Sequence, residues 1–260
     1  NDKLLSPGSI VVVGASNHVT KPGGKIVKNL LEHEFKGALY AVNPTDPSVQ
    51  GVTTYASVEL LPHVDLAILA IPAATCPAAV EVLARQKQTK AFIIISGGFS
   101  EMGDEGKALE QQIVQTINET GGCLIGPNCI GVLTPAYAGV FTTPIPHLDP
   151  AGCDFVSGSG ATAVFIIESA IPKGLTFSRV FSVGNSAQIG VEEVLEYWDR
   201  HSDQPSESKL KLIYVEQIVN PDKFLLHASS LVRKGFQLAA IKAGSSSAGS
   251  RAATSHTGAM

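Results

Sequence analysis

The chain has 260 residues, of which 44% are hydrophobic and 16% charged, and its formal net charge is −4. This composition is typical of a globular protein with one large or two ordinary domains. The basic residues are not clustered, which argues against a nucleic-acid surface. No apolar run is long enough to cross a bilayer, and the first residues do not resemble a signal peptide.

The four cysteines, Cys76, Cys123, Cys129 and Cys153, have neither the spacing of metal ligands nor the density of a disulfide framework. We therefore expect no metal site in this chain. Free thiols are typical of a reducing compartment, so the expected location is the cytoplasm.

Short β-rich runs alternate with helical patterns along the first half of the chain. This alternation is typical of βαβ units and predicts a parallel sheet. The expected strands are 10–13, 38–42, 65–71, 91–95 and 123–125. The expected helices are 23–33, 73–88 and 103–120, each with apolar residues at helical spacing.

The stretch 134–152 shows no periodicity and holds four prolines, so we expect a linker there between domains 1–133 and 153–260. The alternation then resumes. The expected strands are 154–157, 177–183, 211–215 and 238–241, and the expected helices are 161–172, 191–198 and 221–232. The fold class is therefore α/β, with two domains and no obvious repeat between them.

In the first domain, a cluster of special residues lies at the end of every predicted strand: Gly14-Ala15-Ser16, Asn43-Pro44, Ile71-Pro72, Ser96-Gly97-Gly98 and Gly126-Pro127-Asn128. Ligands of open α/β sheets bind beyond the carboxyl ends of the strands. The Gly14 turn opens a helix and could receive a phosphate. The Gly-x-Gly-x-x-Gly fingerprint is absent, and Asn43 stands where a dinucleotide site would have an acid. A nucleotide-like ligand is favoured over a dinucleotide, although ordinary turn chemistry could explain any single cluster.

In the second domain, the corresponding features are Ser157–Gly160, Gly184-Asn185-Ser186, Glu216 and a run of small residues that contains His256. The Ser157–Gly160 turn precedes a helix and could hold an anion. A carboxylate at Glu216 could fix one imidazole nitrogen of His256 and leave the other as a nucleophile. On spacing alone, a solvated strand-end acid and a surface histidine are the simpler interpretation of this pair.

Taken together and in order, these segments resemble the alpha subunit of the NDP-forming acyl-CoA synthetases, relatives of succinyl-CoA synthetase, and most closely the ADP-forming acetyl-CoA synthetases. The most specific elements are Gly126-Pro-Asn-Cys129 and Ser255-His-Thr-Gly-Ala259. The resemblance covers nearly the whole chain. It implies a Rossmann-like CoA-binding domain followed by a flavodoxin-like domain that is truncated at its C-terminal end.

The resemblance also implies residue roles. A histidine that relays a phosphoryl group matches His256, and the acid that steadies it matches Glu216. The implied coenzyme A contacts are Gly14, Ala15, Ser16, Asn17, Lys21, Lys25, Asn43, Pro44, Ile71, Pro72, Ser96, Gly97, Gly98 and Asn128. The implied phosphate and substrate contacts are Ser157, Gly158, Ser159, Gly160, Gly184, Asn185, Ser255, Thr257 and Gly258.

The implied reaction converts acyl-CoA, phosphate and ADP to carboxylate, CoA and ATP. No ATP-grasp pattern is present, so ADP or ATP with Mg²⁺ would bind to an ATP-grasp beta subunit or to a downstream domain of the same native chain. The resemblance also implies an oligomer. It fits imperfectly at Ser245-Ser246, where relatives often have a basic residue, and at Ala187-Gln188, where many have Ala-Asp.

Two other hypotheses remain open at this point. The chain could be a regulatory CoA- or acyl-CoA-binding module, such as those fused to protein acetyltransferases, but the presence of both Glu216 and His256 argues against this. It could also be a dinucleotide oxidoreductase, on fold analogy alone.

Overall fold

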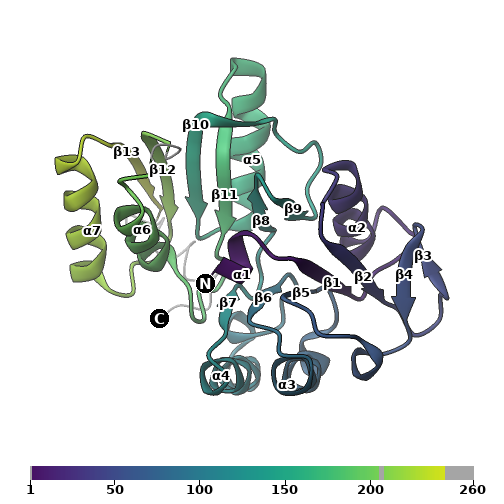
Figure 1. The fold of residues 1–260 in the computed structure, drawn as a ribbon. Coiled ribbons are helices and arrows are strands. Elements are labelled where there is room, and N and C mark those ends of the chain that lie inside the picture. Colours follow the sequence, from purple (N-terminus) through teal and green to yellow (C-terminus); the bar gives the residue numbers. More distant parts are fainter. Residues whose placement is uncertain (1, 205–207, 244–260) are drawn as a thin grey trace.

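A computed structural model of the protein describes residues 2–204 and 208–243, which form two α/β layered units (Figure 1). The first unit contains α1 (Asp2–Leu5), β1 (Ser9–Val13), α2 (Pro22–Glu32), β2 (Ala38–Val42), β3 (Ser48–Val49), β4 (Val52–Tyr55), β5 (Leu66–Leu69), α3 (Cys76–Gln86), β6 (Ala91–Ile94), α4 (Asp104–Glu119) and β7 (Cys123–Ile125). The second contains β8 (Gly131–Thr134), β9 (Tyr137–Val140), β10 (Leu148–Ser157), α5 (Gly160–Ala170), β11 (Phe177–Ser182), α6 (Val191–Arg200), β12 (Leu210–Val215), α7 (Pro221–Arg233) and β13 (Gln237–Lys242).

The first sheet has the strand order β3-β4-β2-β1-β5-β6-β7 and is parallel except for the short β3. Its central strands are buried on both faces, as expected of a parallel sheet. Ile10 and Val12 face the side covered by α2, whereas Val11 and Val13 face the side covered by α3 and α4. The five predicted strands of this sheet are present; the sequence did not predict the β3–β4 pair.

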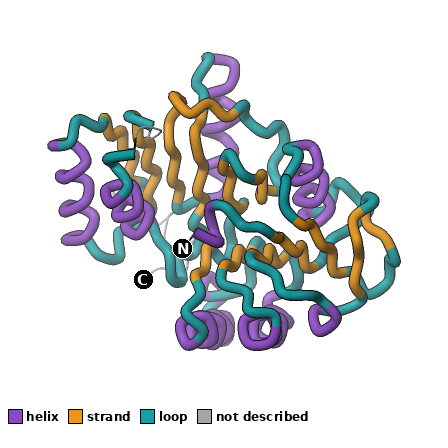
Figure 2. The backbone as a smooth tube through the Cα atoms, in the orientation of Figure 1, coloured by secondary structure: helices purple, strands orange, loops and turns teal. Residues whose placement is uncertain are grey.

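The second sheet has the order β13-β12-β10-β11-β8-β9, with α5 on one face and α6 and α7 on the other (Figures 1 and 2). Strands β8 and β9 form an antiparallel hairpin, and β8 pairs antiparallel with β11. Strand β9 and the start of β10 lie within 134–152, where the sequence showed no periodicity. The hairpin is fixed by contacts distant in sequence, because Asn29 Nδ2 of α2 donates to the carbonyls of Val140 (2.6 Å) and Thr142 (3.1 Å).

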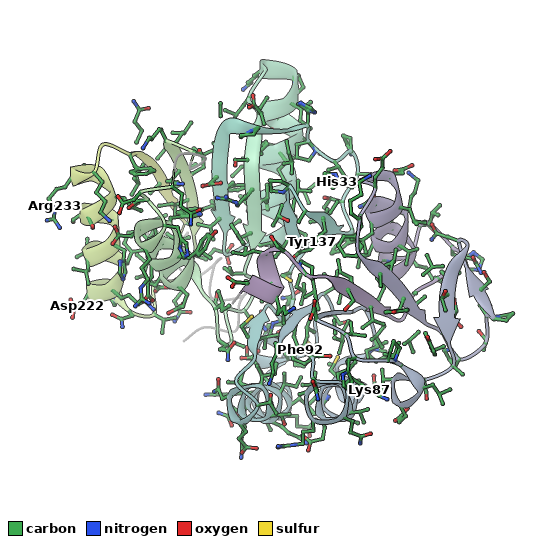
Figure 3. The ribbon with its side chains drawn as sticks, viewed as in Figure 1. His33, Lys87, Phe92, Tyr137, Asp222 and Arg233 are labelled. Atoms are coloured by element: carbon green, nitrogen blue, oxygen red, sulfur yellow. The ribbon has the colours of Figure 1, made fainter. Side chains whose placement is uncertain are left out.

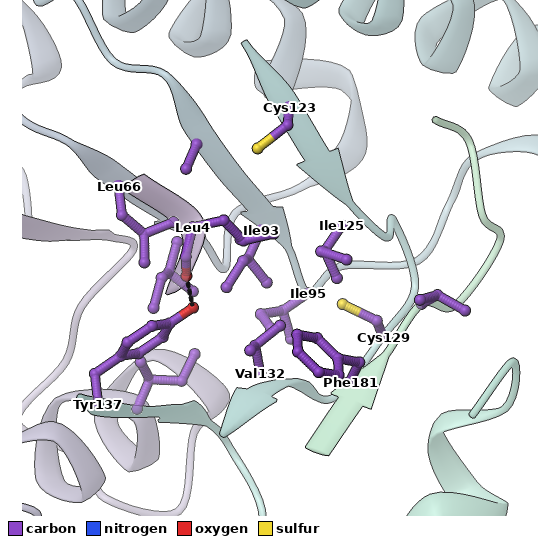
Figure 4. Packing of buried hydrophobic residues seen from close by; sticks show 14 of the residues in the cluster. Leu4, Leu66, Ile93, Ile95, Cys123, Ile125, Cys129, Val132, Tyr137 and Phe181 are labelled. Atoms are coloured by element: carbon purple, nitrogen blue, oxygen red, sulfur yellow. Dashed lines mark hydrogen bonds between the residues drawn. The ribbon is translucent and has the colours of Figure 1, made fainter. Parts of the chain in front are cut away.

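The two sheets share one hydrophobic core (Figure 4). Ile93 and Ile125 of the first sheet pack in the same cluster as Val132 and Phe181 of the second. Tyr137 Oη of β9 donates to the Leu4 carbonyl at 2.7 Å, which ties α1 to the hairpin. The relative position of the two sheets is therefore set by buried side chains.

The ends of α7 follow the rules that its sequence suggested. Asn220 accepts a hydrogen bond from the Lys223 N–H at 3.0 Å, and Pro221 occupies the first turn. Asp222 lies in the first turn and Arg233 in the last, at opposite ends of the helix dipole (Figure 3). None of the helices in the described part of the chain is long and apolar enough to cross a membrane.

Candidate functional site between the two sheets

Turns at the carboxyl edge of the first sheet contact one another in a row. Asn43 Nδ2, at the end of β2, donates to the Ala15 carbonyl at 2.9 Å. A Cβ built at Gly14 would lie 2.8 Å from the Ile71 side chain, so these two turns are adjacent. Ser96 Oγ donates to the Ile71 carbonyl at 2.5 Å. The sequence-predicted clusters thus form one continuous edge.

The first turn of α2 packs tightly against the turn after β1. A Cβ at Gly23 would lie only 2.0 Å from the Gly14 carbonyl oxygen, so this approach requires glycine. Lys21 is the N-cap of α2 and its side chain makes no capping hydrogen bond. Lys21 is exposed and Lys25 is half-buried. Two lysines therefore flank a helix N-terminus, which is a favourable arrangement for a phosphate.

Side chains from the second strand and the β3–β4 turn brace this region. Asn43 Oδ1 accepts the backbone N–H groups of Thr45 (2.8 Å) and Asp46 (2.9 Å). Gln50 donates to the carbonyl of Ser16 at 2.9 Å, and its own N–H donates to Asn17 Oδ1 at 2.9 Å. Asn43 thus holds the turn in shape through local hydrogen bonds. From the sequence, only the absence of an acid at this position was apparent. Pro44 follows it and is exposed.

A cavity of about 730 Å³ lies at the junction of the two sheets. Seven of the sequence-predicted site residues line it: Asn128, Gly158, Ser159, Gly160, Gly184, Asn185 and Glu216. Among the other lining residues are Ile95, Ser100, Lys107, Ile130, Phe141, Val164, Glu192, Gln217 and Val219, none of which was predicted as a site residue. The remaining described candidates, including Ser157 and the Gly14–Gly98 edge, are not among its lining residues.

The N-terminus of α5 opens onto this cavity. Ser159 is the N-cap, and its side chain accepts from the Thr162 N–H at 3.4 Å. The buried Ser157 donates its hydroxyl to the Ser159 carbonyl at 2.7 Å and so holds the turn in shape. A Cβ at Gly158 would lie 3.8 Å from the Glu216 backbone nitrogen. The backbone at Glu216 therefore lies beside the turn that leads into α5, and both line the cavity.

Glu192, at the start of α6, has a role that the sequence did not indicate. It is buried, and its Oε1 accepts the N–H groups of Val219 (2.7 Å) and Asn220 (3.0 Å). These bonds hold the segment after Glu216 against α6. The available signal was an acid in the first turn of α6 between the apolar residues Val191 and Val194.

Asn185, which lines the cavity, connects the two domains. Its Nδ2 lies 2.5 Å from Glu101 Oε2, 3.2 Å from Glu110 Oε2 and 3.2 Å from Ser100 Oγ. Burial alone would raise the pKa of Glu101, but hydrogen bonds from Asn185 and from backbone N–H groups, chiefly that of Gly98, outweigh it and hold the pKa below its ordinary value. Glu101 therefore stays ionised near neutral pH.

Gln188 also joins the domains. Its Oε1 accepts the Leu124 N–H of β7 at 2.6 Å, and its Nε2 donates to Asn118 Oδ1 at 2.6 Å. The adjacent Ile189 forms a parallel bridge with Ile125, so this segment covers the edge of the first sheet. The position at which the resemblance fits imperfectly, Ala187-Gln188, therefore makes a structural contact at this edge.

Four predicted site residues, Ser255, His256, Thr257 and Gly258, lie outside the described residues. For the others, the geometry defines two connected parts: a polar edge that begins at a helix N-terminus, and a cavity that ends at a second helix N-terminus beside Glu216. This arrangement is typical of a protein that binds an elongated, phosphate-bearing ligand across two α/β domains.

Comparisons with known proteins agree with that class. Residues 8–135 match the family model described as a CoA binding domain, and residues 150–260 match the one described as a succinyl-CoA ligase like flavodoxin domain. The chain is 36% identical over its whole length to the alpha subunit of acetate–CoA ligase [ADP-forming] II of Pyrococcus furiosus, and covers 55% of it. It is also 36% identical to acetate–CoA ligase [ADP-forming] I of Archaeoglobus fulgidus, and covers 37% of that protein.

The fold agrees as well. All of the chain superposes on 55% of the acetyl-coenzyme A synthetase 1 of Ca. Korarchaeum cryptofilum, solved with phosphate and ADP, with a TM-score of 0.88 and 30% identity. The chain thus spans about half or less of the length of these relatives. It belongs to the family of the ADP-forming acyl-CoA synthetases and corresponds to their alpha subunit or N-terminal part.

Proposed function

We propose that this chain is the CoA-binding and phosphohistidine-bearing part of an NDP-forming acyl-CoA synthetase. The observation that carries the proposal is the continuity of the site. Contacts link Asn43 to Ala15, Ile71 to Ser96, and Asn128 to Asn185, so that the edge beside α2 leads to the cavity beside Glu216. A long ligand with phosphates at one end and a reactive group at the other, such as acyl-CoA, suits this path.

In this proposal, the α2 end binds the nucleotide portion of CoA. Lys21, Lys25 and the N–H groups at the start of α2 face its phosphates. The turns at Ile71-Pro72 and Ser96–Gly98 contact the pantetheine arm, because they lie next along the edge. The thioester then lies in the cavity, whose lining includes Glu216, the α5 N-terminus and apolar residues such as Ile130 and Phe141.

The proposed chemistry has three steps. A phosphate oxygen attacks the thioester carbonyl carbon, the C–S bond breaks, and CoA leaves with a proton on sulfur. His256 then attacks the phosphorus of the acyl phosphate, a P–N bond replaces the P–O bond, and the carboxylate leaves. Finally ADP takes the phosphoryl group and forms ATP. Glu216 would orient the imidazole, and the α5 N-terminus would stabilise the phosphate dianion.

The last step needs a nucleotide site. Because the chain covers 37% and 55% of two ligase relatives, we propose that an ATP-grasp subunit or a further domain of the native protein supplies that site and its Mg²⁺. We also propose an oligomeric assembly and a cytoplasmic location, which the four reduced and buried cysteines suit.

The test is the formation of phosphohistidine by the complete enzyme. Incubation with acetyl-CoA and labelled phosphate should give an acid-labile, base-stable adduct, and His256→Asn should abolish both the adduct and ATP formation. Glu216→Gln should slow the formation of the adduct by about 100-fold, because the imidazole loses its charged orienting partner.

The matched control is His63→Asn, which changes an exposed histidine of the first domain. It should leave the adduct and ATP formation unchanged. Full ATP synthesis by His256→Asn would exclude the relay. If the wild-type enzyme binds CoA but never forms the adduct, the chain is a regulatory CoA-binding module instead.

A further inference from the structure

A chain of side-chain amides and one carboxylate runs from the CoA-facing edge to the cavity. Glu101 Oε1 accepts the Gly98 N–H at 2.5 Å, and its Oε2 accepts from Asn185 Nδ2 at 2.5 Å. Asn128 Nδ2 in turn lies 3.3 Å from Asn185 Oδ1. Glu101 and Asn128 belong to the first domain and Asn185 to the second, so this series of hydrogen bonds crosses the junction between the domains twice.

The donor and acceptor of each hydrogen bond in this series follow from the chemistry of the groups. An ionised carboxylate only accepts hydrogen bonds, so Glu101 requires the NH₂ group of Asn185 on its side. The Asn185 carbonyl oxygen then faces Asn128, which must present its own NH₂ group. Glu110 reinforces the orientation, because its carboxylate also lies 3.2 Å from Asn185 Nδ2. Ser100 donates to Glu110 at 2.9 Å, which leaves its oxygen to accept from Asn185.

Asn128 is held in place by its backbone as well. It has a φ of +59°, a left-handed conformation that asparagine tolerates better than most residues. Its NH₂ group carries two hydrogens, of which Asn185 takes one. Because Asn128 and Asn185 both line the cavity, the second hydrogen is available to an acceptor there.

We propose that Asn128 donates this hydrogen bond to the carbonyl oxygen of the acyl thioester, and that Glu101 is a positioning residue that makes Asn128 a donor. The inference rests on the proposed function, since it places the thioester in the cavity. When a phosphate oxygen adds to the carbonyl carbon, the C=O electron pair moves to oxygen. The Asn128 N–H stabilises that charge until the C–S bond breaks and the carbonyl re-forms.

The sharpest test is Glu101→Gln in the complete enzyme. The glutamine oxygen still accepts from the Gly98 N–H, so the new NH₂ group faces the NH₂ group of Asn185. Two donors then face each other, and Asn185 loses its acceptor at residue 101. Asn128 then loses its enforced orientation, and kcat should fall by about 100-fold, as when one oxyanion donor is lost. The KM for CoA should stay unchanged, because the Gly98 loop keeps its acceptor. Glu105→Gln, at an exposed acid in the first turn of α4, is the matched control and should alter neither constant.

A second measurement reads the hydrogen bond directly. The infrared C=O band of ¹³C-labelled acetyl-CoA should shift to lower frequency on binding to the wild-type enzyme. The shift should shrink in both Glu101→Gln and Asn128→Asp, and persist in Glu105→Gln. A band that does not shift, or a Glu101→Gln variant whose KM for CoA rises while kcat stays constant, would overturn the proposal.

These outcomes separate the inference from the proposed function. If phosphohistidine forms normally but the band does not respond to Glu101→Gln, the relay of amides is wrong and the synthetase function stands. If the band responds but the wild-type enzyme forms no phosphohistidine, the amide contact to acyl-CoA stands and the synthetase function fails.

Discussion

The two ends of the site are built in different ways. At the α2 end, the turn after β1 is held by Asn43 and Gln50, all within the first 50 residues. At the cavity end, Asn185 reaches Glu101 and Glu110, which lie 84 and 75 residues earlier in the chain. The first end is a property of one domain, whereas the second exists only when both domains are packed together. A defect at the first should therefore affect CoA binding alone, and a defect at the second should affect the whole junction.

The largest expected effect is that of Gly184→Ala at the junction. Gly184 has a φ of +54°, and a Cβ there would lie 2.2 Å from the Pro127 carbonyl oxygen. Strain and steric overlap together should cost about 3 kcal/mol of unfolding free energy. Displacement of Asn185 should also lower kcat by about 100-fold. Denaturant unfolding and steady-state kinetics measure the two effects.

Gly174→Ala is the control for the strain alone. Gly174 has a φ of +77°, but a Cβ there would meet no atom within 4 Å. We expect a cost of about 1 kcal/mol and normal kinetics. If the two variants were equally stable and equally active, the close packing of the domains at Gly184 would have no functional role.

Sequence reasoning succeeded where the pattern is local. The helix at 23–33 and the strand at 38–42 nearly coincide with α2 and β2, because apolar spacing and turn residues lie side by side in the chain. Clusters at strand ends could also be placed on one edge, since parallel strands share that edge by geometry. The turns of the early part of the candidate site could accordingly be placed on one edge from the sequence, and their role in binding stays a prediction.

Sequence reasoning failed where the structure depends on distant partners. The β8–β9 hairpin has only four residues in each strand, and it is fixed by Asn29 and Leu4. Glu101 lies in a short turn before α4 and Glu110 lies within α4, and nothing in their spacing indicates that they accept from Asn185. Glu192 stands out as an acid among apolar residues of α6, but this does not identify Val219 and Asn220 as its donors. Their roles arise from the packing of two domains, which one sequence does not encode in any local pattern.

A smaller effect is expected for Gly23→Ala at the α2 end. Alanine favours the helix by about 1 kcal/mol, but its Cβ would overlap the Gly14 carbonyl and push α2 away from the turn. The overlap should outweigh the gain in helix propensity and cost about 2 kcal/mol of unfolding free energy. The affinity for CoA should fall about tenfold, which is about 1.4 kcal/mol. Calorimetry with CoA measures the loss.

The same variant should still form phosphohistidine from acetyl phosphate, since that step does not need CoA. Gly121→Ala is the control, because its positive φ costs stability but no neighbour lies within 4 Å. Loss of phosphohistidine in Gly23→Ala would mean that the two ends of the site are not independent.

The smallest effect is expected for Asn43→Ala. This variant removes the acceptor of the Thr45 and Asp46 N–H groups and the donor to the Ala15 carbonyl. Because the turn is half exposed, water can replace part of these bonds, and the cost should be about 1 kcal/mol. CoA affinity should fall a few-fold, less than in Gly23→Ala, because α2 itself does not move. Thr45→Ala is the control, because it keeps the backbone hydrogen bonds to Asn43 and should be nearly neutral. If its CoA affinity were as low as that of Asn43→Ala, the hydroxyl at residue 45, and not the asparagine, would organise this end of the site.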